Sequence, residues 1–352
     1  RGIFRASGLG AAILLAVAAG PAGSGPYEEG LKLEAEGRND EARAKYADHL
    51  KLNPDDRGAR IRLIHVMIGS GALEEAEKAL APELARAPSD PALVNELGRL
   101  RFNQGRYPEA VKAFESATSA DPKFLDAVHN LGIALQQVGQ NDRARAAFER
   151  ALAINPAFVR SLNALGVLEA RQKRHDAALK ALWEAERLSP GDFETLMNLG
   201  VACGEADKPA ESAEYFRRAV GARSDSAEAR NNLGRALTRL KKYKEAEAEL
   251  REAIRLDSRL AEPHFNLGVV FEEQQLKVEA EKEYTQTLEM EPKFAEAAFR
   301  LGNVLLGKVQ DQQYAGNAEA QRVQMEAARA MYEKALKANP EYSEVLYNLV
   351  LV

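Results

Sequence analysis

The tripeptide Asn-Leu-Gly occurs four times in this chain at a regular spacing. It begins at Asn130, Asn198, Asn232 and Asn266, and the last three copies are 34 residues apart. The first copy precedes the second by 68 residues, which is two such periods. A constant period of about 20 to 50 residues is typical of repeat architectures. We therefore expect an array of repeats, in which each unit packs only on its neighbours.

The 34-residue register extends over nearly the whole chain. With Gly268 as position 8, position 7 is usually Leu, position 20 is mostly Ala, position 24 is large and position 32 is often Pro. Apolar residues at positions 4, 7 and 11 share one face of a first helix, and those at 20, 24 and 27 share one face of a second. Each unit is predicted to be a helix-turn-helix hairpin, because Pro ends the second helix. Nine units begin at residues 23, 57, 91, 125, 159, 193, 227, 261 and 295.

This pattern resembles the tetratricopeptide repeat family in its period and in its Leu-Gly, Ala, aromatic and Pro positions. The resemblance covers residues 23–352. It implies an all-α, right-handed superhelical solenoid of helix-turn-helix hairpins. The family's Trp at position 4 is replaced here by residues such as Val128 and Leu162.

The ninth unit departs from the register. Its Ala and aromatic positions resume 14 residues late, at Ala328 and Tyr332, which predicts a 14-residue insertion near residues 308–321. Asn317 is expected to cap a second helix that starts at Ala318 and is about two turns longer than its relatives. The insertion is either an element that protrudes toward a partner or an enlarged surface loop.

Residues 343–352 are predicted to be the first helix of a tenth unit. The segment is too apolar for a free outer face, with Leu346, Leu349 and Val352 among its residues. We expect it to pack on a continuation of the chain or on something outside it. Self-association through this helix is a further expectation.

Residues 1–22 differ in composition from the repeats. Arg1 and Arg5 precede an uncharged run whose apolar centre, Leu9 to Ala19, has about the length of a signal-peptide core. We expect a signal peptide or an N-terminal membrane anchor; the alternative is the apolar start of a truncated chain. The expected location is extracytoplasmic, either periplasmic or secreted, with a membrane tether if the segment is retained.

Composition and motifs exclude several functions. The net charge of −5 and the pI of about 5.8 argue against nucleic-acid binding. The single cysteine, Cys203, falls at a core position, and the five histidines are scattered, so neither a metal nor a cofactor is expected. The chain has no Gly-rich phosphate loop and no nucleophile elbow. It is therefore predicted not to be an enzyme.

The resemblance implies that the first helices line a concave groove, into which positions 2, 5, 6, 9, 12 and 13 point. We call these the groove positions. Position 6, which lies off the packed face, is often Asn, and a side-chain amide can both donate to and accept from a peptide backbone. The alternative is that these amides bond within the solenoid or to water. Ten groove residues are candidates for partner binding: Asn130, Asn198, Asn232, Asn266, Arg99, His129, Arg160, Arg171, Arg235 and Arg239.

Acidic groove residues follow the basic ones along the chain, at Glu262, Glu272, Glu273 and Glu296, which predicts a partner with its acidic part toward the N-terminal side; the alternative is scattered, solvated charge. The chain is thus expected to be a scaffold that binds an extended peptide or helix of a partner protein, in bacterial envelope assembly. The alternative is the substrate-recruiting region of a larger enzyme, a glycosyltransferase or protease, whose catalytic domain lies outside this chain.

Overall fold

The structure is a computed structural model that describes residues 25–309 and 317–350. Those residues form nineteen α-helices and no β-strand. They divide into two compact units, one ending at Leu168 and one starting at Glu169. The segment expected to be a signal peptide or anchor, residues 1–22, lies outside the described residues.

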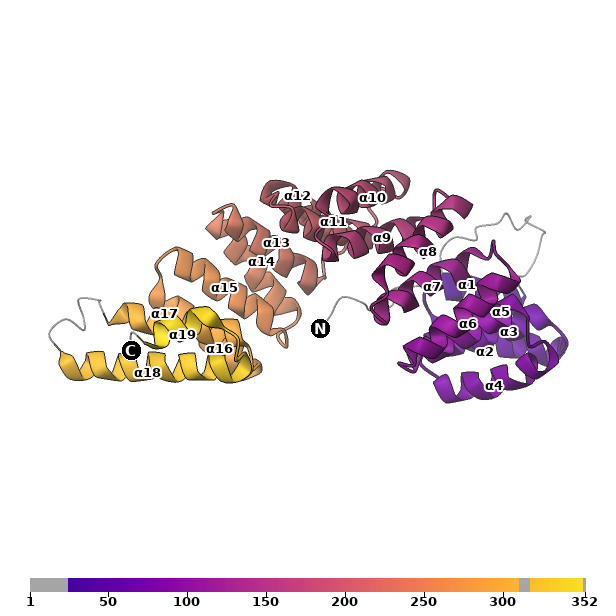
Figure 1. Ribbon diagram of the computed structural model, residues 1–352, viewed down its shortest axis with the longest axis horizontal. Coiled ribbons are helices and arrows are strands. Elements are labelled where there is room, and N and C mark those ends of the chain that lie inside the picture. Colours follow the sequence, from indigo (N-terminus) through magenta and orange to yellow (C-terminus); the bar gives the residue numbers. More distant parts are fainter. Residues whose placement is uncertain (1–24, 310–316, 351–352) are drawn as a thin grey trace. The chain divides into compact units, whose positions relative to one another are not determined.

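Unit 1 is a series of antiparallel hairpins, in which each helix from α1 to α8 packs against its neighbours along the chain (Figure 1). The first helices of successive hairpins also touch, as α3 touches α5 and α5 touches α7. The helices are α1 (Pro26–Ala35), α2 (Asn39–Leu52), α3 (Arg57–Gly69), α4 (Leu73–Arg86), α5 (Pro91–Asn103), α6 (Tyr107–Ala120), α7 (Leu125–Gln137), α8 (Asn141–Ile154) and most of α9 (Val159–Arg171).

Unit 2 repeats the same arrangement, with α13 touching α15 in addition to its sequential neighbours. The all-α array of hairpins predicted from the period is thus confirmed in both units. The helices of unit 2 are α10 (His175–Leu188), α11 (Phe193–Glu205), α12 (Pro209–Ala222), α13 (Ala227–Arg239), α14 (Tyr243–Leu256), α15 (Ala261–Glu273), α16 (Lys277–Met290), α17 (Ala295–Lys308), α18 (Ala318–Ala338) and α19 (Ser343–Leu349).

The core of each hairpin forms where position 8 meets position 24. In the hairpin of α5 and α6, a Cβ placed on Gly98 would lie only 2.5 Å from Cε1 of the buried Phe114 ring. Any side chain larger than hydrogen would push the two helices apart. The Gly at position 8 is therefore fixed by helix-to-helix packing rather than by backbone conformation.

The turn inside each of the first eight hairpins takes a left-handed residue at position 15, whereas Val309 in the ninth has φ −54°. In unit 1 this residue is glycine, as at Gly71 with φ 82° and Gly105 with φ 76°. In unit 2 it is Lys173, Asp207, Lys241 or Gln275, with φ between 57° and 62°. The left-handed region is unfavourable for residues with a Cβ, so the turns of unit 2 carry strain that those of unit 1 avoid.

The second helix of the ninth hairpin is longer than its relatives. α18 has 21 residues, whereas α16 has 14. Asn317 Oδ1 accepts a hydrogen bond from the Ala320 amide at 3.0 Å. The predicted cap and the predicted two extra turns are both confirmed. Half of the inserted segment, residues 310–316, lies outside the described part of the chain.

The last helix of the array, α19, is only partly covered. Val345 is buried against the preceding hairpin, and Leu346, Tyr347 and Val350 are 51%, 72% and 86% exposed. The apolar outer surface expected for this helix is therefore present in the structure.

Candidate functional site

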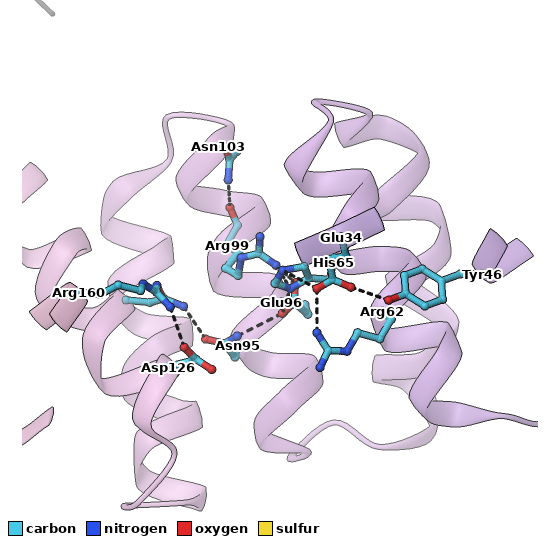
Figure 2. Close-up of polar contacts among 11 residues, drawn as sticks. Glu34, Tyr46, Arg62, His65, Asn95, Glu96, Arg99, Asn103, Asp126 and Arg160 are labelled. Atoms are coloured by element: carbon cyan, nitrogen blue, oxygen red, sulfur yellow. Dashed lines mark hydrogen bonds and ion pairs between the residues drawn. The ribbon is translucent and has the colours of Figure 1, made fainter. Parts of the chain in front are cut away.

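The groove positions of unit 1 carry a series of polar contacts between side chains of neighbouring first helices. Figure 2 shows Glu34 from α1, Arg62 and His65 from α3, and Glu96 and Arg99 from α5 lying toward one another. Most of these groups are buried or half-buried. Leaving a buried polar group without a partner costs more free energy than its hydrogen bond contributes to stability. These contacts therefore stabilise the packing of neighbouring hairpins.

The carboxylate of Glu34 is bonded through both oxygens. The Tyr46 hydroxyl donates to Oε2 at 2.7 Å, and Arg62 Nη1 donates to Oε1 at 2.8 Å. Burial of Tyr46, together with this contact, raises the pKa of its hydroxyl. The three residues occupy positions 12 and 24 of one unit and position 6 of the next. The contact therefore joins two repeats.

Glu96 and Arg99 are one turn apart on α5, and both are buried. Arg99 Nη1 donates to Glu96 Oε2 at 2.5 Å, and His65 Nδ1 lies 3.2 Å from Glu96 Oε1. Burial on its own raises the pKa of Glu96, but the charges of Arg99 and His65 outweigh burial and lower that pKa to about 2. The guanidinium of Arg99, a predicted partner-binding group, is thus engaged inside unit 1.

Asn130 is also engaged inside unit 1. Its Nδ2 donates to Asn95 Oδ1 at 3.1 Å, and Asn95 Nδ2 donates to Glu96 Oε1 at 3.2 Å. At this position the amide bonds within the solenoid, which was the alternative to peptide contact. Contact of Asn130 with a partner stays a prediction, and it would require this pair to open.

His129 and Arg160 lie near each other between α7 and α9. His129 is 5% exposed, its Nδ1 lies 3.0 Å from Ser161 Oγ, and its ring packs on Phe148 and Phe158. Burial, and then the charge of Arg160, holds the pKa of His129 well below its usual value, so the imidazole is neutral. Arg160 Nη1 donates to Asp126 Oδ1 at 3.0 Å. Unit 1 therefore presents less free positive charge than its sequence suggests.

Unit 2 repeats the Glu-Tyr-Arg contact at the same repeat positions. Glu272 Oε2 accepts a hydrogen bond from the Tyr284 hydroxyl, and Arg300 Nη1 donates to the same oxygen at 3.2 Å. Arg300 Nε also donates to Glu296 Oε1 at 3.3 Å. Two of the four acidic groove residues therefore have partners within the chain.

Asn266 has a partner of the same kind as Asn130. Its Nδ2 donates to Asn231 Oδ1 at 2.8 Å, and in both pairs the acceptor lies 35 residues earlier. The expectation that position 6 takes no part in packing is wrong for Asn266 and Asn130. Each amide joins its own first helix to the preceding one.

Asn198 and Asn232 differ from these two. Both are half-buried, on α11 and α13, and neither has a side-chain hydrogen bond within the described part of unit 2. The residue 35 positions before Asn232 is Met197, whose thioether cannot replace an amide oxygen as an acceptor. The amide of Asn232 therefore keeps its hydrogen-bonding capacity for another molecule.

Arg235 and Arg239, one turn apart on α13, line a cavity of about 310 Å³ formed by α11, α12 and α13. Arg239 donates to the Gly204 carbonyl at 2.8 Å and to Asp207 Oδ1 at 2.7 Å. Arg235 has no hydrogen bond or ion pair to any described residue. Its side chain is exposed, and loss of hydration beside the cavity, followed by the charge of Arg239, lowers its pKa. The tenth predicted residue, Arg171, is exposed near the end of α9 and already has a partner.

Other reactive groups in the described residues are built into the core or dispersed. Cys203 is fully buried, as predicted, and burial raises the pKa of its thiol to about 11. Within residues 25–309 and 317–350, no three His, Cys, Asp or Glu side chains are grouped to hold a metal ion. In the same ranges, the helices are all too short or too polar to cross a bilayer.

Family comparisons agree with the repeat register in both units. The models described as tetratricopeptide repeat match residues 33–100, 129–193 and 321–342, and the model described as TPR repeat matches residues 98–139 and 234–275. The chain is a tetratricopeptide repeat protein. As such an array, it is a scaffold for protein–protein interaction. Comparison with curated protein sequences gives no match.

Solved structures share the fold at low sequence identity. A chain of the APC/C hetero-tetramer Cut9–Hcn1 is 19% identical, with a TM-score of 0.64 over 80% of this chain and 55% of that one. This tetratricopeptide repeat protein thus spans about half the length of that relative. A tetratricopeptide repeat protein from Parabacteroides merdae is 16% identical, with a TM-score of 0.53 over 76% and 97% of the two chains. Pseudomonas aeruginosa PilF is 22% identical, with a TM-score of 0.51 over 57% and 92%.

The sequence interpretation missed the residues that occupy the asparagine amides. Asn95 and Asn231 stand at position 5, next to the conspicuous position 6, and were not considered as its partners. In both bonded pairs the acceptor is an Asn 35 residues earlier, on the preceding first helix, but the spacing alone does not predict the bond, because Asn163 stands 35 residues before Asn198. Glu34 and Glu272 do carry a signal, because each stands 12 residues before a Tyr at position 24.

Proposed function

We propose that this tetratricopeptide repeat protein is a non-enzymatic scaffold that binds an extended segment of a partner protein along the groove positions of α11 and α13. The observation that supports the proposal is the unused amide of Asn232; Asn198, at the equivalent position of the preceding first helix, also has no side-chain hydrogen bond within the described part of unit 2. A peptide backbone offers both the acceptor and the donor that such an amide lacks. Contacts of this kind give affinity without requiring a particular side chain in the partner.

The groove positions of unit 1 are less suited to this role. Glu34, Glu96, Arg99 and Asn130 already bond to one another or to their neighbours within the unit. A partner would have to replace these bonds before gaining any of its own, and a buried group left unpaired costs about 1 to 3 kcal/mol. Unit 2 can accept a partner at Asn198 and Asn232 without breaking a side-chain hydrogen bond within its described residues.

Site-specific photo-crosslinking in the native host tests this function. A photoreactive phenylalanine analogue replaces Asn232 on α13 in one variant and the exposed Ala248 on α14 in the control. We expect a discrete crosslinked protein from position 232 that is missing from position 248. Crosslinks of equal yield from both positions, or from position 248 alone, would place the binding surface elsewhere.

We also propose that the protein acts outside the cytoplasm, in assembly of the bacterial envelope. This rests on the sequence of residues 1–22 and, for the envelope role, on analogy between folds, which carries no chemical detail. A fusion of the full chain to alkaline phosphatase tests the location, because that reporter needs an oxidising compartment for its disulfides. An expressed but inactive fusion would contradict the proposal.

The exposed face of α19 supports a separate proposal of self-association. Leu346, Tyr347 and Val350 would be covered by a second copy or by a continuation of the chain. Light scattering compares the mass of the chain that ends at Val352 with the mass of a shortened chain that ends at Pro340 and so lacks α19. Equal masses per chain would argue against self-association through this helix.

A further inference from the structure

Arg235 differs from the other arginines on first helices in having no partner. Within the described residues it makes no hydrogen bond and no ion pair within 4.0 Å. The other first-helix arginines all have a partner in the chain: Arg57, Arg60, Arg62, Arg99, Arg101, Arg160, Arg171, Arg230, Arg239 and Arg300. The absence of a partner is therefore specific to this position.

The repeat register explains why Arg235 lacks a partner. It stands at position 9, where Arg99 in unit 1 has His65 one period earlier and Glu96 one turn earlier. One period before Arg235 is Val201, and one period after it is Val269. Neither valine can accept a hydrogen bond. The residue one turn before Arg235 is Asn232, which has no negative charge.

The surroundings of Arg235 favour a singly charged anion. The cavity beside it is lined by two cations, Arg235 and Arg239, and by one carboxylate, Glu205. The guanidinium of Arg239 is fixed by Gly204 and Asp207, so Arg235 is the group available to a ligand. Because Asp207 already pairs with Arg239, one carboxylate is enough to match Arg235, and Glu205 disfavours negative charge beyond that. The Arg235 side chain is exposed, so its guanidinium is accessible to a ligand from solvent.

We propose that the cavity formed by α11, α12 and α13 binds the side-chain carboxylate of an Asp or Glu residue in the partner segment, with Arg235 as its partner. A guanidinium presents paired N–H groups that match a carboxylate in a bidentate contact. Asn232, one turn away on α13, would hold the adjacent peptide backbone. This inference rests on the proposed function, because the carboxylate belongs to the partner segment that is proposed to bind in the groove.

Selection of short random peptides on the purified full chain tests the inference. The enriched peptides are synthesised with amidated C-termini, and their affinities are measured by fluorescence anisotropy. The proteins compared are the wild type, Arg235→Gln and the control Arg259→Gln, which removes the same charge from a side chain that is 88% exposed in a turn between hairpins. We expect enriched Asp or Glu, and affinity about tenfold weaker for Arg235→Gln only.

A double-mutant cycle separates a direct contact from a general effect of charge. Replacing the enriched Asp or Glu of the peptide with Asn or Gln should weaken binding to the wild type and have no further effect on Arg235→Gln. Additive losses, or equal binding by wild type and Arg235→Gln, would overturn the carboxylate site. Binding that survives only with a free C-terminus would also overturn it, because the carboxylate would then be terminal.

The experiments distinguish failure of the carboxylate site from failure of the proposed function. Peptides that lose affinity on Asn232→Ala but contain no enriched acid would leave the groove proposal standing and refute the Arg235 site. Failure to enrich any peptide, or binding that is insensitive to Asn232→Ala, would contradict both.

Discussion

Asn266 and Asn231, which are 35 residues apart, are joined by a hydrogen bond of 2.8 Å from Nδ2 to Oδ1. Asn232, at the equivalent position of the preceding repeat, has Met197 at that spacing and no such bond. Asn266 and Asn232 stand at the same repeat position and therefore look equivalent in the sequence, but their contacts differ. Asn266 connects two repeats, and Asn232 is open to a partner.

This difference predicts unequal losses of stability for two matched alanine variants. Asn266→Ala removes a half-buried hydrogen bond and should lower the free energy of unfolding by about 1 kcal/mol. Asn232→Ala removes no bond within the chain and should change it by less than about 0.5 kcal/mol. Urea denaturation followed by circular dichroism measures both. Equal destabilisation by the two variants would contradict the assignment.

The Glu34 carboxylate predicts a measurable role for the Tyr46 hydroxyl. Tyr46→Phe keeps the buried ring but removes the donor to Glu34 Oε2, and should cost about 1 to 2 kcal/mol of unfolding free energy. The control is Tyr107→Phe, at a half-buried tyrosine whose hydroxyl has no side-chain partner among the described residues; little change is expected there. If Tyr46→Phe is as stable as the control, the Glu-Tyr-Arg contact does not stabilise the array.

Two glycine substitutions should have opposite signs. Gly98→Ala places a Cβ 2.5 Å from the Phe114 ring, so repacking should cost about 1 to 3 kcal/mol. Gly221→Ala near the end of α12 meets nothing within 4 Å and should stabilise by up to about 1 kcal/mol through helix propensity. Thermal denaturation of both variants checks the signs. A neutral Gly98→Ala would show that position 8 does not limit the approach of the helices.

The low pKa of Glu96 predicts acid sensitivity in unit 1. Its pKa falls from 4.5 to about 2 on folding, so its contribution to stability is complete above pH 4.5 and is lost as the pH falls toward 2. Glu96→Gln should be less stable at neutral pH, because Arg99 loses its buried carboxylate, but its stability should depend less on pH in this window. Thermal unfolding across the window gives the slope. An unchanged slope in Glu96→Gln would contradict the shift.

The hairpins could be predicted from the sequence because the period fixes the packing residues. Leu at position 7, Gly at position 8 and a large residue at position 24 recur with the spacing that one helix face requires. α3, α5 and α7 begin at Arg57, Pro91 and Leu125, where the register starts a unit. Local capping could be anticipated in the same way, as at Asn317.

Which groove residues are buried and bonded within the chain could be predicted only in part. The sequence places Arg99, His129 and Asn130 at groove positions, but the structure buries all three. Burial at these positions depends on the residue that the neighbouring first helix presents, such as His65 for Arg99 or Asn95 for Asn130. That pairing depends on how successive hairpins are offset. Position numbers counted within one unit do not show this offset.

The most direct test of the account measures the affinity of the partner segment found by crosslinking. The double variant Asn198→Ala with Asn232→Ala is compared with the wild type and with Asn266→Ala, by calorimetry on the full chain. The account predicts binding about tenfold weaker for the double variant, since each lost hydrogen bond contributes about 0.5 to 1.5 kcal/mol, and near wild-type affinity for Asn266→Ala. Equal affinity of the double variant and the wild type would contradict binding through the groove positions of α11 and α13.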